Sequence, residues 1–451
     1  MNENKKTLIF GAAAVVLLIL AIFSSPGRIT PEAFLDLGEK FFPTFTDPNE
    51  ATTLEVMDYD EATAKAKPFK VTFKGNRWTI PSHHDYPADA RDRLARTAAG
   101  IIDIQKGDFR TDNVADHEAC GVIDPLDESA STSGRGQRVT IRAEDDRVLA
   151  DLILGKPVEG RTGFRFVRLP QQSRVYVSQV DVDLSTKFED WIDTDLLRLS
   201  EAKIEAVTLR DYSINERTLS VDNRDNIILT EGSDGWSIRG ASSQVVDSAA
   251  MKQLVGSITG LSIVGVRPKP EGLSASLKVA GARTELTQRD IVSLQERGFY
   301  LSREGQLLSN EGELQVMTID GILYTLRFGE VVYGTGLALT AGGQEGSGQA
   351  KEGEGENRYL FITADFDFNY FKEPPKPSDA SFVGKPDSLL TDADRRNRQQ
   401  QRAHDEWRRQ VVNGQRLAGE LSNRFADWYY VISADSYDKI HLTRSDLIVS
   451  Q

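Results

Sequence analysis

A repeated series of short motifs most constrains the fold of this chain, because a duplicated sequence implies two units of one topology. Residues 54–59 and 207–212 both alternate apolar and polar side chains and end in Asp-Tyr. Residues 71–80 and 228–238 both contain a Gly in a short turn, followed by a Trp. In each copy this pattern is typical of a β-hairpin with Trp on its second strand.

Further matches follow in the same order. An amphipathic helix is predicted after each hairpin, with Asp89 and Asp247 close to the two helix starts. The apolar positions at helical spacing are Ala90, Leu94, Thr97, Ala98, Ile101 and Ile102 in the first helix, and Ala250, Leu254, Val255, Ile258 and Leu261 in the second. Later, residues 149–155 resemble 323–329, residues 163–169 resemble 357–363, and residues 188–191 resemble 425–428.

We therefore predict an α+β fold with two tandem related units of mixed or antiparallel sheet and covering helices, at residues 50–200 and 201–451. The second unit has insertions. Residues 336–357 form a Gly-rich loop with too little apolar surface to order itself. Residues 372–424 contain a Pro-rich spacer and then an Arg-rich helix, predicted over residues 391–423.

The Arg-rich helix contrasts with the rest of the chain. Residues 394–416 hold seven arginines and three acids, whereas the whole chain has a formal net charge of −14. This excess fits contact with anionic lipid or with an acidic partner. It also fits a solvated helix packed by Ala403, Trp407 and Val411. The acidic balance of the whole chain argues against a nucleic-acid partner.

The N-terminus carries an apolar segment. Lys5 and Lys6 precede an uncharged run at residues 7–23, which is near the minimum length for a transmembrane helix. The preceding positive charges favour an N-terminus inside and a body outside the cytoplasmic membrane. We predict a retained single-pass anchor within residues 1–28. A cleaved signal peptide, without a clear A-x-A site, and a buried globular helix are the alternatives.

The residue types used in catalysis and metal binding form no complete constellation. Cys120 is the single cysteine, which excludes an intramolecular disulfide and disfavours a cysteine zinc site. His83-His84-Asp85 and the pair His117 and Cys120 could each contribute to a metal site, but neither supplies enough ligands locally. The patterns G-x-S-x-G, H-E-x-x-H and the phosphate loop are absent, and Ser131 and Ser133 lie in a predicted linker.

Several acids and tryptophans occur in both copies. Asp58 and Asp211 recur, as do Asp190 and Asp427, which favours a structural role because one active site does not need two equivalent centres. Asp190 and Asp427 are predicted to cap or anchor a helix that carries the following Trp. The tryptophans are predicted core anchors or, alternatively, sugar-binding platforms: Trp78, Trp236, Trp191 and Trp428.

A family resemblance rests on the paired Trp hairpins, the apolar N-terminal segment, the Ala-Cys-Gly-Val-Ile-Asp-Pro stretch at residues 119–125, and the Gly-Lys-Pro-Val at residues 155–158. Together these resemble the bacterial family called domain of unknown function 4340. Its Tyr-Gly-Leu-x-x-Pro motif is matched here by residues 120–125, with Cys for Tyr and Val for Leu. The resemblance implies a membrane-anchored envelope protein, associated in some members with ABC-type export or gliding-motility gene clusters. It assigns no catalytic residues.

We therefore expect a non-enzymatic, membrane-anchored extracytoplasmic scaffold or auxiliary component of an ABC-type export complex. Its expected partners are the membrane and an ABC permease, with no catalytic, cofactor or metal site. One alternative is a carbohydrate-binding or cell-wall-associated protein that uses an exposed Trp78 or Trp236. Another is an enzyme, which predicts a deep cleft lined by acids with shifted pKa values.

Overall fold

The chain divides into two compact units. The computed structural model describes residues 14–15, 36–215, 217–218, 220–241, 243–278, 286–334, 336–342 and 356–449. By their contacts, residues 1–70 and 92–184 form the first unit, and residues 71–91 and 185–451 form the second. The predicted ranges of 50–200 and 201–451 differ from these units in the placement of residues 71–91 and 185–200.

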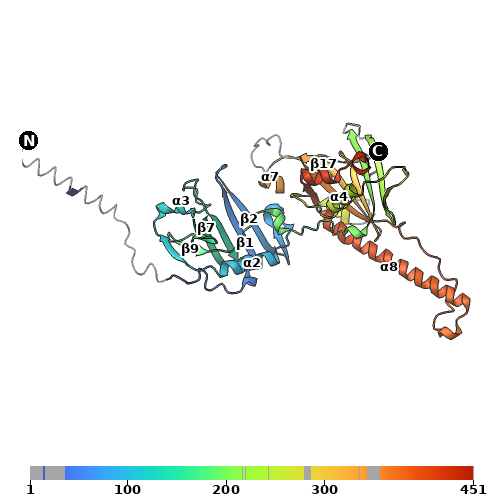
Figure 1. The fold of residues 1–451 in the computed structure, drawn as a ribbon, viewed down its shortest axis with the longest axis horizontal. Coiled ribbons are helices and arrows are strands. Elements are labelled where there is room, and N and C mark those ends of the chain that lie inside the picture. Colours follow the sequence, from blue (N-terminus) through green and yellow to red (C-terminus); the bar gives the residue numbers. More distant parts are fainter. Residues whose placement is uncertain are drawn as a thin grey trace, which may run out of the picture. The chain divides into compact units, whose positions relative to one another are not determined.

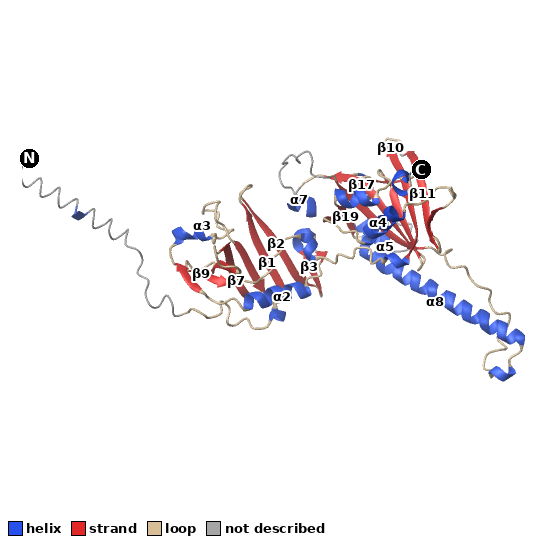
Figure 2. Ribbon diagram, viewed as in Figure 1, coloured by secondary structure: helices blue, strands red, loops and turns tan. Residues whose placement is uncertain are grey.

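The first sheet contains nine strands among the described residues, in the order β4-β3-β2-β1-β6-β7-β8-β9-β5 (Figures 1 and 2). Helix α2 (Arg91–Ile102) follows the hairpin and buries the predicted positions from Leu94 to Ile102. The strands are β1 (Thr53–Asp60), β2 (Lys65–Lys74), β3 (Arg77–Ile80), β4 (Tyr86–Pro87), β5 (Asp108–Thr111), β6 (Gln137–Arg142), β7 (Val148–Pro157), β8 (Phe164–Arg168) and β9 (Val175–Gln179).

The second sheet has eight strands in its described part, in the order β12-β11-β10-β16-β17-β18-β19-β13. These are β10 (Ile204–Asn215), β11 (Ser220–Gly232), β12 (Gly235–Ile238), β13 (Gly265–Pro268), β16 (Glu313–Thr318), β17 (Ile322–Val332), β18 (Asn357–Phe366) and β19 (Trp428–Ile432). A separate ribbon pairs β14 (Phe299–Leu301) with β15 (Leu307–Ser309). The helices are α4 (Ser248–Thr259), α5 (Glu271–Lys278), α6 (Gln288–Gln295), α7 (Gly336–Ala341), α8 (Asp392–Ala426), α9 (Ala434–Ile440) and α10 (Arg444–Leu447).

The two sheets have the same strand order, as expected of a duplication. Reading from β3 to β5 in the first sheet and from β12 to β13 in the second, the strands correspond one to one. The register agrees as well. Leu54 pairs with Ile141 and its counterpart Val207 pairs with Val316, and all four side chains are buried. Alternate positions of these strands face a core, which explains the period-two sequence pattern.

One of the six sequence matches is not supported by this topology. Residues 188–191 form a 3-10 turn that comes after β9. Residues 425–428 join the end of α8 to β19, which is the counterpart of β9. The first segment therefore follows its strand in the sequence, whereas the second precedes the equivalent strand. Their shared Phe-x-Asp-Trp pattern does not mark equivalent positions.

The predicted fold class needs correction at the N-terminus. No helix in the described part of the chain is long and apolar enough to cross a membrane, so the predicted transmembrane helix is not found. Of the predicted span at residues 7–23, the structure describes only Ala14 and Val15, and the rest lies outside the described residues. The prediction also allowed either mixed or antiparallel sheets. The strand pairs with a defined register are antiparallel, because short turns join most neighbouring strands.

The largest difference between the sheets lies in one connection. In the first sheet, residues 169–174 join β8 to β9 as a short turn. In the second, residues 367–427 join the corresponding strands and contain α8. Helix α8 has 35 residues, which corresponds to a length of about 52 Å. It runs past the edge of the sheet in its own unit (Figure 1).

Candidate functional site

The histidines considered as metal ligands are used in packing. His83 is 4 % exposed, stacks on Phe188 with a centroid separation of 4.4 Å, and shares a hydrogen bond of 2.8 Å with Thr340. Burial lowers the pKa of His83 to about 4, and the neighbouring charges of His84 and Arg267 act in the same direction. The ring of His84 lies 2.7 Å from the carbonyl oxygen of Ala341. Both imidazoles therefore fasten the turn after β3.

The pair His117 and Cys120 lies on the single turn α3 (His117–Cys120). The His117 ring is 2.7 Å from the Ser173 carbonyl oxygen, and Cys120 is a buried free thiol whose pKa is raised by burial. Nearby, Ser131 and Ser133 hydrogen-bond each other at 3.0 Å in a loop. Among the described residues, no group of three or more His, Cys, Asp or Glu side chains could hold a metal ion.

The tryptophans differ in burial. Trp191 is fully buried and donates to the Ser185 carbonyl oxygen at 2.9 Å. Trp78, Trp236 and Trp428 are only half-buried. Trp78 contacts Phe73 at a centroid separation of 5.3 Å. The carbohydrate alternative required an exposed ring at Trp78 or Trp236, and neither is among the exposed large apolar side chains of the described residues.

The recurring acids have different partners in the two copies. Asp58 accepts from Gln137 at 2.8 Å, and its counterpart Asp211 accepts from Arg224 at 2.7 Å. Asp427 is the C-cap residue of α8, and its carboxylate contacts Ser274 and Lys278. Asp190 accepts from Ser185. The expectation that Asp427 caps or anchors a helix carrying the following Trp is wrong, because Asp427 ends α8 and Trp428 begins strand β19.

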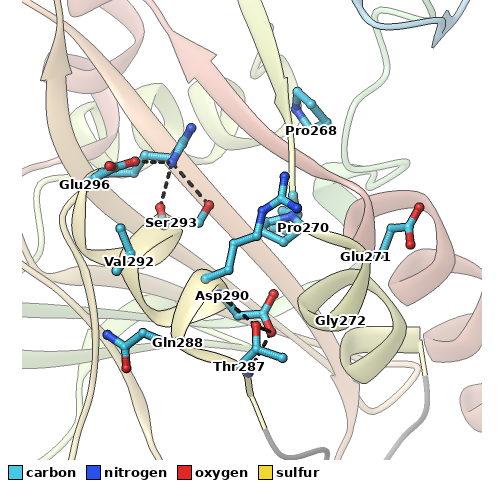
Figure 3. A pocket seen from close by; sticks show the side chains of 13 residues that line it. Pro268, Pro270, Glu271, Gly272, Thr287, Gln288, Asp290, Val292, Ser293 and Glu296 are labelled. Atoms are coloured by element: carbon cyan, nitrogen blue, oxygen red, sulfur yellow. Dashed lines mark hydrogen bonds and ion pairs between the residues drawn. The ribbon is translucent and has the colours of Figure 1, made fainter.

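A hollow lies in the second unit, between the start of α5 and helix α6. It has a volume of about 980 Å³, and Figure 3 shows its lining side chains. Prolines and one valine provide the apolar surface, and charged groups of both signs surround them. The lining residues are Pro268, Lys269, Pro270, Glu271, Gly272, Thr287, Gln288, Arg289, Asp290, Val292, Ser293, Glu296 and Arg297.

Asp290 holds the wall of this hollow together. Its carboxylate accepts from the backbone N–H of Thr287 at 2.8 Å and completes a capping box at the start of α6. It also accepts from the backbone N–H of Leu273 at 3.3 Å in α5. Burial acts to raise the pKa of Asp290, but these hydrogen bonds outweigh it and the pKa is lowered. A carboxylate kept ionised as a cap for two helices is not poised to act as a general acid.

Lys269 also lines the hollow and anchors the C-terminal end of α8. Its ammonium donates to the Phe425 carbonyl oxygen at 2.9 Å and lies 3.8 Å from the centroid of the Phe361 ring. The side chain is buried, which lowers its pKa well below the usual value, and Asp427 opposes this shift. A lysine at this place satisfies one of the carbonyls that a helix leaves unpaired at its end.

The C-terminal half of α8 packs on the second sheet. Ala418, Leu421 and Phe425 are buried, and Arg424 donates to the Leu196 carbonyl oxygen at 3.0 Å. A Cβ added at Gly414 would lie only 2.3 Å from the Phe366 ring. Gly414 therefore marks a position where α8 passes very close to β18.

The N-terminal half of α8 projects beyond the sheet and is braced by the segment that precedes it. We call residues 367–413 the arm. Trp407 donates to the Phe371 carbonyl oxygen at 3.0 Å, and His404 lies 3.3 Å from Glu373. At the far end, Thr391 and Asp394 form a capping box. Lys385 donates to Asp394 at 2.9 Å, and these contacts hold the pKa of Asp394 far below its usual value.

The buried stripe of the arm differs from the predicted one. Asn397 and His404 are buried, Trp407 and Val411 are half-buried, and Ala403 is exposed. The buried positions recur at spacings of three and four residues along one face of the helix, which leaves most of the arginines in solvent. A search of the sequence for heptad spacing would have found this pattern, because Asn397, His404, Val411, Ala418 and Phe425 are each seven residues apart.

Comparison with known proteins identifies a family and nothing beyond it. Neither the curated proteins nor the solved structures include a match to this chain. Residues 78–276, from β3 into α5, match the family described as domain of unknown function (DUF4340). The arm and α8 lie outside the matched range. Residues 78–276 are thus similar to the DUF4340 family.

Proposed function

We propose that this chain is a non-enzymatic assembly module that holds a partner protein through its arm. The observation that carries the proposal is the connection between β18 and β19. The first sheet closes the equivalent connection with residues 169–174, whereas the second inserts residues 367–427. The sheet topology does not require this insertion, so the arm needs another explanation.

The contacts of the arm support a role as a rigid projection. Ordering a long segment costs roughly 1–2 kcal/mol of backbone entropy per residue, which the contacts of that segment must offset. Specific bonds along the arm, at Phe371, Glu373 and Lys385, contribute to this offset. At the other end of α8, Lys269 and Arg424 fix the helix to the body. A helix held at both ends can present its exposed face in one orientation.

The family resemblance supplies the setting of the proposal. We infer that the chain is an auxiliary component of an ABC-type export complex, with a permease as the partner, on the extracytoplasmic side of the cytoplasmic membrane. These points rest on the resemblance alone. Binding through the arm is the part that derives from the chain's own geometry.

An arm-shortened variant tests the proposal. Residues 374–403 would be replaced by a short Gly-Ser linker, which is feasible because Glu373 and His404 lie side by side at 3.3 Å. The base of α8 and its contacts with Lys269 would be kept. We expect the variant to remain folded, as judged by hydrogen exchange in β18 and β19, and to lose a permease that copurifies with the full-length chain.

Site-specific photocrosslinking gives an independent measurement in cells. A photoreactive residue at Gln399, which is exposed on the arm, should form an adduct with the partner. The same residue at Gln253, which is exposed on α4, is the matched control and should form no such adduct. Equal adducts from both positions, or normal copurification of the arm-shortened variant, would refute the proposal.

A further inference from the structure

The exposed face of α8 carries a regular row of arginines. Arg395, Arg402, Arg409 and Arg416 occur at every seventh position and are all exposed. Seven residues of α-helix advance about 10.5 Å, so the row extends over about 31 Å. Successive members drift by only about 20° around the helix, so all four stay on one side. We call these four residues the arginine row.

The row lies away from the stripe that packs against the brace. Three row members follow a position of the packed heptad by five residues: Arg402 follows Asn397, Arg409 follows His404 and Arg416 follows Val411. Five residues correspond to about 140° around a helix with 3.6 residues per turn. The guanidinium groups therefore point into solvent. After the hydrogen bond from Arg398, the charges of Arg402 and Arg395 are also near enough to Asp387 of the bracing segment to lower its pKa.

The ion pairs of the row within the chain are weak. Arg395 lies 3.7 Å from Asp392, Arg409 lies 2.6 Å from Glu406, and Arg416 lies 2.6 Å from Glu420. All six side chains are largely exposed, and pairs of this kind contribute about 0–1 kcal/mol. Arg402 forms no ion pair within the described residues. The four cations therefore remain available to an external anion.

We propose that the arginine row binds an acidic surface of a partner protein, with carboxylates spaced by about 10 Å as they are on one face of a helix. This inference rests on the proposed function and adds the chemistry of the partner. Charge complementarity supports it, because the row is a concentrated positive feature in a chain with a formal net charge of −14. Three of the four row members lie within the arm, which extends beyond the edge of its sheet (Figure 1). Charges separated by more than about 8 Å are largely screened at physiological salt, so the acidic body has little effect there.

Other anions fit the row less well. A helix that binds a lipid surface inserts an apolar face, but Trp407 of α8 donates to the Phe371 carbonyl oxygen of the bracing segment. A fixed spacing on a rigid helix adds affinity only where the partner's charges also have fixed positions, which favours a folded protein surface.

The test uses the full-length chain with a photoreactive residue at Val412, which is 56 % exposed beside the row. Three forms are compared in cells. The first is the natural row. The second replaces three of the four arginines, Arg402→Gln/Arg409→Gln/Arg416→Gln, and is called the neutral variant. The third keeps the net charge but breaks the spacing. This third variant is Gln399→Arg/Arg402→Gln/Arg409→Gln/Asn413→Arg, which uses exposed positions for the new arginines. The crosslinked partner segment is identified by mass spectrometry.

We expect an adduct with a protein segment that carries acidic residues at helical spacing. Its yield should fall by about tenfold or more in both variants, because each lost surface pair contributes modestly and the losses combine. An unchanged yield in the neutral variant would overturn the inference and leave the proposed function intact. Full yield in the charge-conserving variant would overturn the match of spacing. Absence of any adduct from Val412 and from Gln399 would instead refute the proposed function.

Binding to lipid vesicles distinguishes an anionic lipid from an acidic protein as the ligand of the arginine row. The purified full-length chain would be sedimented with vesicles that contain phosphatidylglycerol and phosphatidylethanolamine, at physiological salt. We expect no difference in cosedimentation between the natural chain and the neutral variant. Vesicle binding that depends on the arginine row would overturn the proposal of a protein partner.

Discussion

Two glycines of α8 provide a matched test of how the helix is seated on the sheet. Both lie in the helix interior, where replacing Gly by Ala normally stabilises a protein by about 0.4–1 kcal/mol. At Gly419, which is exposed, an added Cβ would have no other atom within 4 Å. We therefore expect Gly419→Ala to raise the free energy of unfolding by about 0.5–1 kcal/mol.

The same change at Gly414 should have the opposite effect. The new Cβ would lie 2.3 Å and 2.5 Å from two ring carbons of Phe366, and 3.0 Å from the Asp320 carbonyl oxygen. Overpacking of this kind costs about 1–3 kcal/mol, which exceeds the gain in helix propensity. The two alanine variants should thus differ in stability by about 1–3 kcal/mol. Gly414→Ala should be the less stable of the two.

A local probe is needed, because a chain with two units need not unfold in one step. Hydrogen exchange of α8 amides measures the relevant opening reaction. Gly414→Ala should speed exchange around residues 411–426, and Gly419→Ala should slow it. Adding Phe366→Leu should partly restore protection in Gly414→Ala, because the smaller side chain removes the clash. If Gly414→Ala slowed exchange as Gly419→Ala does, the proposed close seating on β18 would be wrong.

Three further changes test the anchors of the second unit. Burial lowers the pKa of Lys269, so below about pH 10.4 the unfolded chain binds more protons than the folded chain. The natural chain should therefore gain stability relative to Lys269→Met as the pH rises towards 10, by up to about 1.4 kcal/mol per pH unit. Urea titrations at several pH values measure this difference. The pKa of His83 is about 4 in the folded chain and about 6.5 in the unfolded chain. As the pH falls from 6.5 to 4, the natural chain should therefore lose up to about 3 kcal/mol of its free energy of unfolding. The variant His83→Gln should not show this loss in the same titrations. Asp394→Ala should speed amide exchange in the first turns of α8 by about fivefold or more, whereas Asp392→Ala, beside it and exposed, should have little effect.

The sheets were the more predictable part of the fold. The alternation at residues 54–59 and 207–212 identified β1 and β10, because each strand has one face on a core. The motifs at residues 149–155 and 323–329 lie in the equivalent strands β7 and β17. The match between residues 188–191 and 425–428 failed, because three shared residue types can recur by chance where no periodic pattern supports them.

The arm and the hollow were less predictable. The seven arginines were visible in the sequence, but the sequence does not show which side of α8 is packed and which is exposed. The packed side is set by contacts with the bracing segment, which is distant in the sequence. Lys269 was not singled out, because a lysine is rarely buried and nothing local indicates that it reaches the carbonyl oxygen of Phe425. The hollow forms where residues after β13 meet α6, and one sequence does not reveal such a contact.

The matched connections of the two sheets show where a chain with this topology tolerates changes of length. A link that is a short turn in one copy and contains a helix in the other can change length without disturbing the strands on either side. Each added turn of helix would move a bound protein about 5.4 Å further from the sheet. Under the proposed function, the length of this link acts as a spacer that sets the distance between the sheet and the bound protein.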